Sequence, residues 1–429
     1  MFNTLVRNLG DFLRNTLIEC SSGIIKRNRK VGILKLFDAM SFQLQQKSYA
    51  DTTAYLLHNT SVNITRSALV YRRKKLEEEF FNNVYDKIHK KYKHLLENTS
   101  TPRSDGRKLM MVDGSNITFL PTFERHGFSK SGNSKDVTRG LVTGIYNQTD
   151  DTITSLSLGK EYNERKGFLE AVKLINLNSS KAVFVFDRGY WSPEIATYLI
   201  ENNHDFVFRL PCQNRHLRPL QDGTTSDYRG VFEYKERRMP AKVMNVRYLK
   251  YQIQEGGEIY YIVTTLFDNP IDEIKDIYHK RWSIEGVYKL FKDTCDIEPT
   301  KHQLPEFYSQ DIAVFRILYL IQRIVHTLFN GLQKKPYKEN ESINSKHSMN
   351  VLINYVIAKL LHRPKGYIKK TIEQIGHMFG TAVESKPDRV FKRKAHSPSS
   401  KWYAKSRNNQ KVRSASNTSA TIPSDSAIT

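Results

Sequence analysis

Residues 181–191 read KAVFVFDRGYW, and the stretch from Ala182 to Phe186 is an unbroken apolar run. Such a run, rich in β-branched and aromatic side chains, is typical of a strand that is covered on both faces of its sheet. Asp187 follows directly, at the C-terminal end of the predicted strand. Because open α/β sheets place their sites at the C-terminal ends of strands, Asp187 is a candidate functional residue. The alternative is an ordinary aspartate that caps a turn.

A second acid follows a similar run in residues 108–121, which read KLMMVDGSNITFLP. The apolar residues 109–112 predict a buried strand, and we expect Gly114 and Ser115 to end it immediately after Asp113. A charge in the centre of a sheet is costly unless it is paired or binds a metal, so strand ends are the better place for acids. A turn-capping aspartate is again the alternative.

The third informative stretch is IYHKRWSIEGVYKLFKD, residues 277–293, which we predict to be one amphipathic helix. At about 100° per residue, four polar side chains fall on a stripe about 60° wide. They are Tyr278, Arg281, Glu285 and Lys292. The adjoining arc is apolar and suited to burial; it holds Ile277, Ile284, Val287 and Phe291. The alternative is a solvated charged face, on which Arg281 pairs with Glu285 four residues later.

The composition indicates a polyanionic partner. Lysine and arginine total 67 against 44 acidic residues, which gives a formal net charge of +23. A basic protein of the ribosomal kind is the alternative, but 429 residues with 39% hydrophobic content can bury more than one core. Three scattered cysteines favour a reducing compartment, and no apolar stretch reaches the roughly 18–20 residues of a membrane span.

Several other chemistries lack their sequence signatures. Neither paired C-x2-C nor H-E-x-x-H spacing is present, which argues against a site built on cysteine or histidine ligands. A G-x-S-x-G elbow and a Walker loop are also missing, which argues against serine hydrolysis and nucleotide hydrolysis. Carboxylates therefore remain the candidate chemical groups.

Two strand-end aspartates followed by this helix resemble the DDE transposases of the insertion-sequence-4 type, whose signature is a Y-R-E-K helix. VDGSN (112–116) resembles the family's first-aspartate strand, and VFDRGYWS (185–192) resembles its second. The stretch 264–293, TTLFDNPIDEIKDIYHKRWSIEGVYKLFKD, resembles the part that carries the catalytic glutamate. The similarity covers roughly residues 105–330 and is least specific between about 212 and 255.

The resemblance implies that Asp113, Asp187 and Glu285 are the catalytic triad and bind Mg²⁺ or Mn²⁺ as a pair of ions. The chemistry of these side chains agrees, because Mg²⁺ prefers hard oxygen ligands. Two such ions about 3.5–4 Å apart can activate the attacking oxygen of a phosphodiester displacement and stabilise the leaving oxygen.

The resemblance also implies that Tyr278, Arg281 and Lys292 hold the phosphates of transposon ends. Two neighbouring residues are further candidate DNA contacts. Trp282 can stack on an unpaired base or belong to the core, and Arg188 can contact a phosphate or neutralise the acids.

We expect an α/β fold with a ribonuclease H-like catalytic core, because three strands and a helix precede the Asp187 strand. A β-rich insertion, an N-terminal all-helical domain and C-terminal helices complete it. The expected parts are an N-terminal helical DNA-binding domain (1–100), the first part of the core (105–211), the insertion (212–258), the second part of the core (259–335), a C-terminal helical region (336–384) and a basic, disordered tail (385–429).

Two basic regions outside the core are predicted to contact DNA. The polar turn NTSVNITRSAL (59–69) and the basic residues around it, including Arg66 and Arg73, resemble a helix-turn-helix. An antiparallel helix pair with a basic surface is the alternative. Lysine and arginine residues of the insertion, including Arg247, are predicted to help grip DNA, with a solvated sheet face as the alternative.

The function implied by the resemblance is transposition: cleavage at transposon ends and strand transfer into target DNA, within a homodimer that brings two ends together. The protein would act in a bacterial nucleoid or a eukaryotic nucleus, without a membrane. Two alternatives remain: a domesticated relative that binds DNA without catalysis, and a nuclease of the same fold without strand transfer.

Overall fold

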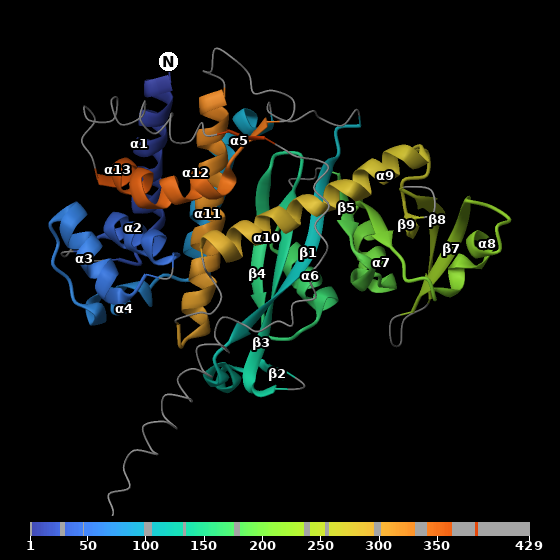
Figure 1. The fold of residues 1–429 in the computed structure, drawn as a ribbon, viewed down its shortest axis with the longest axis horizontal. Helices are drawn as coiled ribbons and strands as arrows, with labels where there is room; N and C mark the ends of the chain where they lie inside the picture. The colour runs from blue at the N-terminus through green and yellow to red at the C-terminus, as the bar shows by residue number, and fades with distance from the viewer. Residues whose placement is uncertain are drawn as a thin grey trace, which may run out of the picture.

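The structure is a computed structural model that describes residues 2–25, 31–45, 47–97, 105–131, 134–175, 181–235, 241–253, 257–295, 302–330, 341–362 and 382–384. Its centre is a mixed sheet with helices on both faces (Figure 1). The α/β class predicted from the sequence is therefore confirmed. Within these ranges, none of the helices combines the length and the apolar character that crossing a membrane requires.

The main sheet has nine strands in the order β2-β3-β1-β5-β6-β9-β8-β7, with β4 also paired to β3. Its strands are β1 (Lys108–Phe119), β2 (Ser129–Ser131), β3 (Ser134–Asn147), β4 (Thr152–Gly159), β5 (Ala182–Phe186), β6 (Asp205–Arg209), β7 (Asp227–Tyr234), β8 (Lys242–Gln252) and β9 (Ile259–Thr264). Strands β1, β5 and β6 run parallel, and every other pair is antiparallel. A short separate pair joins β10 (Glu341–Ile343) to β11 (Ala382–Glu384).

The strands predicted within the insertion are present, and they continue the main sheet. Strand β9 pairs with β6, and β8 and β7 follow outward to the edge. Arg247 of β8 is 8% exposed, donates to the carboxylate of Asp227 at 2.8 Å and to three backbone carbonyls of residues 266–269. The DNA contact predicted for Arg247 is therefore wrong, because its guanidinium is used inside the protein.

Strand β1 is longer than the sequence predicted. The turn preference of Gly114 and Ser115 predicts an end there, but β1 continues to Phe119 because every residue from Met110 to Phe119 pairs with β3. Pairing with β5 on the other side stops at Val112, opposite Phe186. Asp113 therefore pairs with Gly144 of β3 on one side, and on its other side no described strand pairs with it, so the sheet is open there.

Alternate residues of the parallel strands face two separate hydrophobic cores. Met111 and Val185 belong to the core that includes Ile284 and other residues of the helices after the sheet. Val112 and Phe186 belong to the opposite core, with helices α6 (Glu164–Lys173), α7 (Pro193–Glu201) and the short α8 (Arg218–Gln221) near them. All five side chains of β5 are fully buried, as the apolar run predicted.

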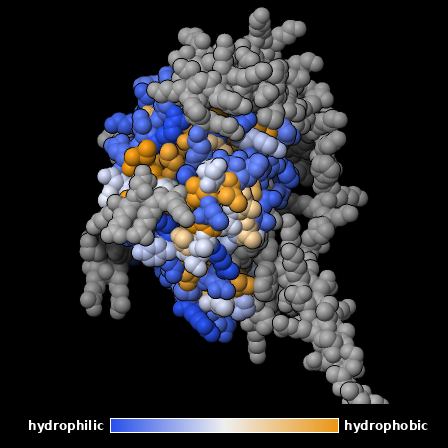
Figure 2. All heavy atoms as spheres, turned by 90° about the vertical axis from the view of Figure 1, so that its left-hand side faces the viewer, coloured by the Kyte–Doolittle hydropathy of each residue, from blue (hydrophilic) through white to orange (hydrophobic). Residues whose placement is uncertain are grey.

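The helices predicted for residues 1–100 are present and pack against the C-terminal helices (Figure 1). They are α1 (Phe2–Cys20), α2 (Ile33–Gln43), α3 (Tyr49–Thr60), α4 (Arg66–Arg73) and α5 (Glu78–Glu97). Their partners are α11 (Pro305–Asn330), α12 (Ser345–Val351), one π-helical turn (Leu352–Val356) and α13 (Ile357–His362). Figure 2 turns the side of these helices toward the viewer and shows a mainly hydrophilic face with small apolar patches.

Arg73, at the end of α4, joins the N-terminal helices to α11. It is fully buried, and its guanidinium donates to Gln310 Oε1 at 2.7 Å, to Gln43 Oε1 at 3.1 Å and to Asp311 Oδ1 at 2.5 Å. It also donates to the backbone oxygen of Phe307 at 2.6 Å. The DNA contact predicted for Arg73 is therefore wrong, because these bonds use its donors.

The predicted signature helix is interrupted. It consists of α9 (Ile271–His279), a 3₁₀ turn (Lys280–Trp282) and α10 (Ser283–Thr294). The four apolar residues expected to be buried, Ile277, Ile284, Val287 and Phe291, are all at most 5% exposed. The predicted tail at 385–429 and residues 336–340 and 363–381 of the predicted C-terminal helical region lie outside the described residues.

Candidate active site

The two aspartates lie side by side at the opening between β1 and β5. The last parallel pair joins Val112 to Phe186. Asp113 is the next residue of β1, and Asp187 directly follows the end of β5 with an extended backbone. Since side chains alternate along a strand, both aspartates are directed to the sheet face that carries Met111 and Val185. This is the face covered by α10.

Glu285 is in the first turn of α10, and Tyr288 holds this helix against the strands. The Tyr288 hydroxyl donates a hydrogen bond that is shared between the backbone oxygens of Asp113, at 2.7 Å, and Val142, at 3.0 Å. A side chain at Gly144 would prevent this, because its Cβ would lie 2.7 Å from the same hydroxyl. Tyr288 thus fixes the helix that carries Glu285 to the strand that carries Asp113.

Arg281 is the cation that the three acids share. It is 6% exposed; its Nη2 lies 3.4 Å from Glu285 Oε1, and its Nη1 lies 3.9 Å from Asp113 Oδ2. Its charge also acts on Asp187. Its Nε is buried and has no hydrogen-bond partner in the described part of the chain. Charge-assisted bonds are normally about 2.7–2.9 Å long, so Arg281 neutralises the acids only loosely.

Asp113 is an acid of this site whose charged form is disfavoured. Burial raises its pKa to about 6, and Glu285 and Asp187 add to the rise, while Arg281 opposes it. A carboxyl group that is buried beside two others gains from any further positive charge placed next to it. The donor chemistry and charge of the cluster therefore fit a divalent cation.

Asp187 is better stabilised than Asp113. Burial acts to raise its pKa, but the backbone N–H of Arg188, the charge of Arg281 and the Tyr278 hydroxyl together hold the pKa below its usual value. The Tyr278 hydroxyl donates to Asp187 Oδ1 at 3.1 Å. Tyr278 is only 3% exposed, so in this structure it supports the acid from within the protein.

The remaining predicted DNA contacts differ in their surroundings. Lys292 is half-buried, and its Nζ donates to the backbone oxygen of Asn116 at 3.0 Å, which adds a second tie between α10 and β1. Trp282 is 45% exposed, so the alternative of a core tryptophan is wrong. Arg188 is exposed beside Asp187. The roles of these residues in binding DNA stay predictions.

The carboxylates do not form a closed ligand set in this conformation. Among the residues that the structure describes, no three acidic, histidine or cysteine side chains are grouped closely enough to hold a metal ion. Arg281 contacts both Asp113 and Glu285 and so lies where a shared cation would be placed. The structure thus brings the predicted acids to one place, with an arginine between two of them.

Tyr288 is a positioning residue that the sequence reasoning did not identify. Its signal was available, because it continues the buried arc of the helix four residues after Ile284 and a buried tyrosine hydroxyl needs a partner. The partner itself was not predictable, since Asp113 and Val142 are remote in sequence.

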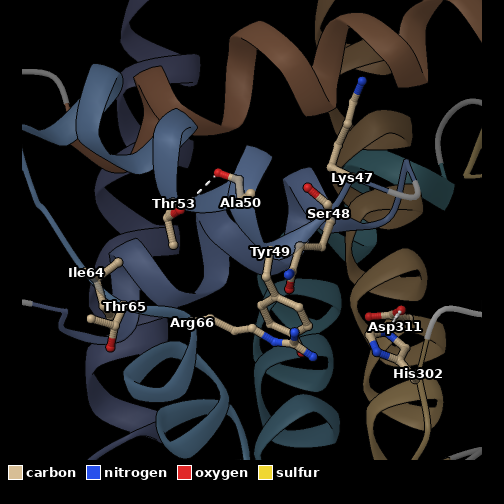
Figure 3. Close-up of a pocket in the computed structure, with 11 residues that line it drawn as sticks. Lys47, Ser48, Tyr49, Ala50, Thr53, Ile64, Thr65, Arg66, His302 and Asp311 are labelled. Carbon is tan, nitrogen blue, oxygen red and sulfur yellow. Dashed lines mark hydrogen bonds and ion pairs between the residues drawn. The ribbon is translucent and has the colours of Figure 1, made fainter.

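A second site of interest lies at the predicted helix-turn-helix. A cavity of about 580 Å³ opens beside the start of α3, and Figure 3 shows Lys47, Tyr49 and Arg66 around it. The Arg66 guanidinium lies 5.2 Å from the centre of the Tyr49 ring. On the far wall, His302 Nε2 is 2.7 Å from Asp311 Oδ2 (Figure 3). Arg66 remains a candidate for a phosphate contact here, unlike Arg73, and Lys47 lines the same cavity.

With this geometry in place, comparison with known families is decisive. The family described as "Transposase DDE domain" matches residues 104–319, which is slightly more than half of the chain and includes Asp113, Asp187 and Glu285. The chain belongs to this family. The predicted resemblance to DDE transposases is confirmed at that level.

Two further comparisons do not refine the family assignment. No curated protein sequence matches this member of the transposase DDE-domain family. Among solved structures, one similar chain is described as "Cryo-EM structure of piggyBac transposase synaptic complex with hairpin DNA". The two chains share 10% sequence identity with a TM-score of 0.41, over 87% of this chain and 85% of the other.

Proposed function

We propose that this protein is a transposase of the insertion-sequence-4 type that cleaves transposon ends and joins them to target DNA. The observation that carries the proposal is the convergence of Asp113, Asp187 and Glu285 around the buried guanidinium of Arg281. The first acid lies in β1, the second directly follows β5, and the third lies in α10. Family membership supports the reaction class, and the convergence supports the choice of residues.

The strand order supports a ribonuclease H-like core. In the order β4-β3-β1-β5-β6, the strand β3 is antiparallel and the other three central strands are parallel. This arrangement explains why two of the acids are neighbours: the pairing of β1 with β5 ends at Val112 and Phe186, directly before Asp113 and Asp187. The third comes from α10, on one face of the sheet.

We propose that Asp113, Asp187 and Glu285 hold Mg²⁺ or Mn²⁺, with two ions per site. When bound, these ions polarise the scissile phosphodiester and favour formation of the attacking oxygen nucleophile. The protein's own residues prepare for this: Tyr278 orients Asp187, and Tyr288 fixes the backbone of Asp113 relative to α10. Asp113 must lose its proton before it can act as a metal ligand.

For DNA binding, we propose that the exposed Trp282 and Arg188, which flank the acids, contact the strand being cut. Tyr278, Arg281 and Lys292 are proposed to hold the phosphates of the transposon end, as the family resemblance implies. The N-terminal helices, with the cavity near Arg66, are proposed to bind the end sequence. A homodimer is proposed to hold two ends together, in the nucleoid or the nucleus.

The test is a cleavage assay on duplexes that carry the DNA flanking this reading frame, where inverted repeats identify the ends. Glu285→Gln keeps the shape of the side chain but removes its charge, so we expect cleavage to fall by roughly a hundredfold or more while DNA binding is retained. Asp293→Asn, at an exposed acid on the same helix, is the matched control and should cleave normally.

The products of the assay separate the proposed function from its alternatives. Joined products with target-site duplication support transposition, and cleavage without joining indicates a nuclease. DNA binding without cleavage by the unaltered protein indicates a non-catalytic relative. Full cleavage by Glu285→Gln would refute the assignment of that residue.

A further inference from the structure

Glu164, the first residue of α6, lies near Asp187 and near Gly114, the residue after Asp113, on the side of the sheet opposite α10. Phe168, one turn further along α6, belongs to the hydrophobic core that contains Val112 and Phe186. Helix α10 packs on the other face. The strands β1 and β5 separate after Val112 and Phe186, so the sheet is open at the level of Asp113 and Asp187.

Two glycines leave room for Glu164 beside the aspartates. A Cβ at Gly189, two residues after Asp187, would lie 2.5 Å from Glu164 Oε2. A Cβ at Gly114, next to Asp113, would lie 3.4 Å from Glu164 Cγ. Any side chain at position 189 would displace the carboxylate, because real Cβ atoms do not approach oxygen that closely. Glu164 thus packs against Gly189, and together with Tyr190 and Leu141 it fills the space at Gly114.

The polar groups at this point lack partners. The Tyr190 side chain is 1% exposed, and its hydroxyl has no hydrogen bond to any described residue. This hydroxyl would lie 3.0 Å from a Cβ at Gly114, the same point that Glu164 Cγ approaches. Within the described ranges, the half-buried Glu164 carboxylate also makes no hydrogen bond or ion pair. Burial and the charge of Asp187 raise the pKa of Glu164.

Such a combination is costly for a purely structural site. Buried hydroxyls and carboxylates are normally hydrogen-bonded, and one that is not indicates a missing ligand or a functional site. The ordinary alternative is an acid in the first turn of a helix, where it stabilises the positive end of the helix dipole. That role needs neither proximity to Asp187 nor the two glycines.

We propose that Glu164 is a fourth acidic residue of the metal site, contributing an oxygen ligand from the face of the sheet opposite Glu285. The inference rests on the proposed function, since it concerns the same divalent ions. Mg²⁺ and Mn²⁺ prefer carboxylate and other oxygen ligands, so a fourth carboxylate can take the place of a bound water, and its negative charge favours a second ion.

The experiment is isothermal titration calorimetry of the full chain with Mn²⁺ alone, without DNA. Glu164→Gln is expected to weaken Mn²⁺ binding by roughly tenfold or more, or to abolish binding of one of two ions. Glu194→Gln is the matched control, because Glu194 is an exposed acid in the first turn of α7 and its loss should leave the isotherm unchanged. Asp113→Asn tests the proposed triad in parallel.

Thermal melting provides a second readout that separates a ligand from a helix-stabilising acid. Without Mn²⁺, Glu164→Gln should melt at the same temperature as the unaltered protein or higher, because a carboxylate repelled by Asp187 has been neutralised. With Mn²⁺, its rise in melting temperature should be smaller. A lower melting temperature together with unchanged Mn²⁺ affinity would mean that Glu164 only stabilises the helix.

The outcomes distinguish this inference from the proposed function. Normal Mn²⁺ binding by Glu164→Gln, with loss of binding in Asp113→Asn, overturns the inference and leaves the proposed function standing. An absence of Mn²⁺ binding in the unaltered protein overturns both. If Glu164→Gln does not fold, Glu164→Asp takes its place; its shorter carboxylate should bind Mn²⁺ more weakly than the original, and equal affinity would refute the inference.

Discussion

Two buried arginines show how the helical region and the acid cluster differ. Arg73 has four hydrogen bonds of 2.5–3.1 Å to Gln43, Phe307, Gln310 and Asp311. Arg281 is almost as deeply buried, but its contacts with Glu285 and Asp113 measure 3.4 and 3.9 Å, and its Nε lacks a partner in the described structure. The guanidinium of Arg73 therefore has hydrogen-bond partners at normal distances, and the guanidinium of Arg281 does not.

The difference distinguishes a structural site from a functional one. A fully bonded buried ion pair holds two segments in one arrangement and leaves no donor for a ligand. A loosely bonded one keeps unbalanced charge that a ligand can complete. By this criterion the Arg73 cluster is structural, and the Arg281 cluster has the unbalanced charge expected of the proposed active site.

The largest expected effect is on stability at the Arg73 cluster. Arg73→Met removes the guanidinium from buried Asp311, Gln43 and Gln310 and leaves Asp311 with His302 as its only partner in the described structure, so the free energy of unfolding should fall by about 3–5 kcal/mol. Arg281→Met should cost less than about 1 kcal/mol, because the carboxylates it leaves are partly exposed and can be hydrated. Urea denaturation of both variants measures the difference. Equal losses would remove the distinction between the two clusters.

The next effect concerns pH. The pKa of Asp113 is about 6 when folded and about 3.9 in unfolded chains, so the folded state binds the proton more tightly. Its contribution to stability is present below pH 4 and is lost as the pH rises through 6, by on the order of 2–3 kcal/mol. Asp113→Asn should remove this loss, as denaturation at pH 4 and pH 7 will show.

Asp311 in the Arg73 cluster provides the opposite case. Burial acts to raise its pKa, but Arg73 and His302 hold it below the usual value. Its contribution to stability is therefore present above pH 4 and is lost as the pH falls through the lowered pKa. Asp311→Asn should thus change the pH dependence in the direction opposite to Asp113→Asn. The same direction for both would contradict the assignment.

The smallest effect compares two tyrosines at the acid cluster. Tyr288→Phe removes the hydrogen bond shared by Asp113 and Val142 and should lower the free energy of unfolding by about 1 kcal/mol. Tyr190→Phe is the matched control, since its hydroxyl makes no bond to the described residues, and should have no effect or a slightly stabilising one. Denaturation curves of the two variants decide; a larger loss for Tyr190→Phe would show that its hydroxyl is bonded after all.

The sequence predicted those features that depend on local pattern. The run from Ala182 to Phe186 could be identified as a doubly covered strand, and the buried arc of the signature helix was right, because alternation and helical spacing are encoded in neighbouring residues. The full length of β1 was not predictable, since its pairing with β3 outweighs the turn preference of Gly114 and Ser115.

The features that were missed depend on contacts remote in sequence. Arg73 looked like a surface charge, but its partners Gln310 and Asp311 follow more than two hundred residues later. Glu164 belongs to no motif of the sequence, and only the fold places it beside Gly189. How the chain divides into domains stays a prediction, as do the DNA contacts.

The 3₁₀ turn at Lys280–Trp282 fixes the length of the segment that precedes Glu285. Each residue of such a turn advances the chain by about 120°, against about 100° in an α-helix. Adding or deleting one residue there would swing Glu285 by roughly a third of a revolution, away from Asp113, while Tyr288 would lose its carbonyl partners. Substitutions should therefore be tolerated at the exposed position 282 far better than any change in the number of residues between Tyr278 and Glu285.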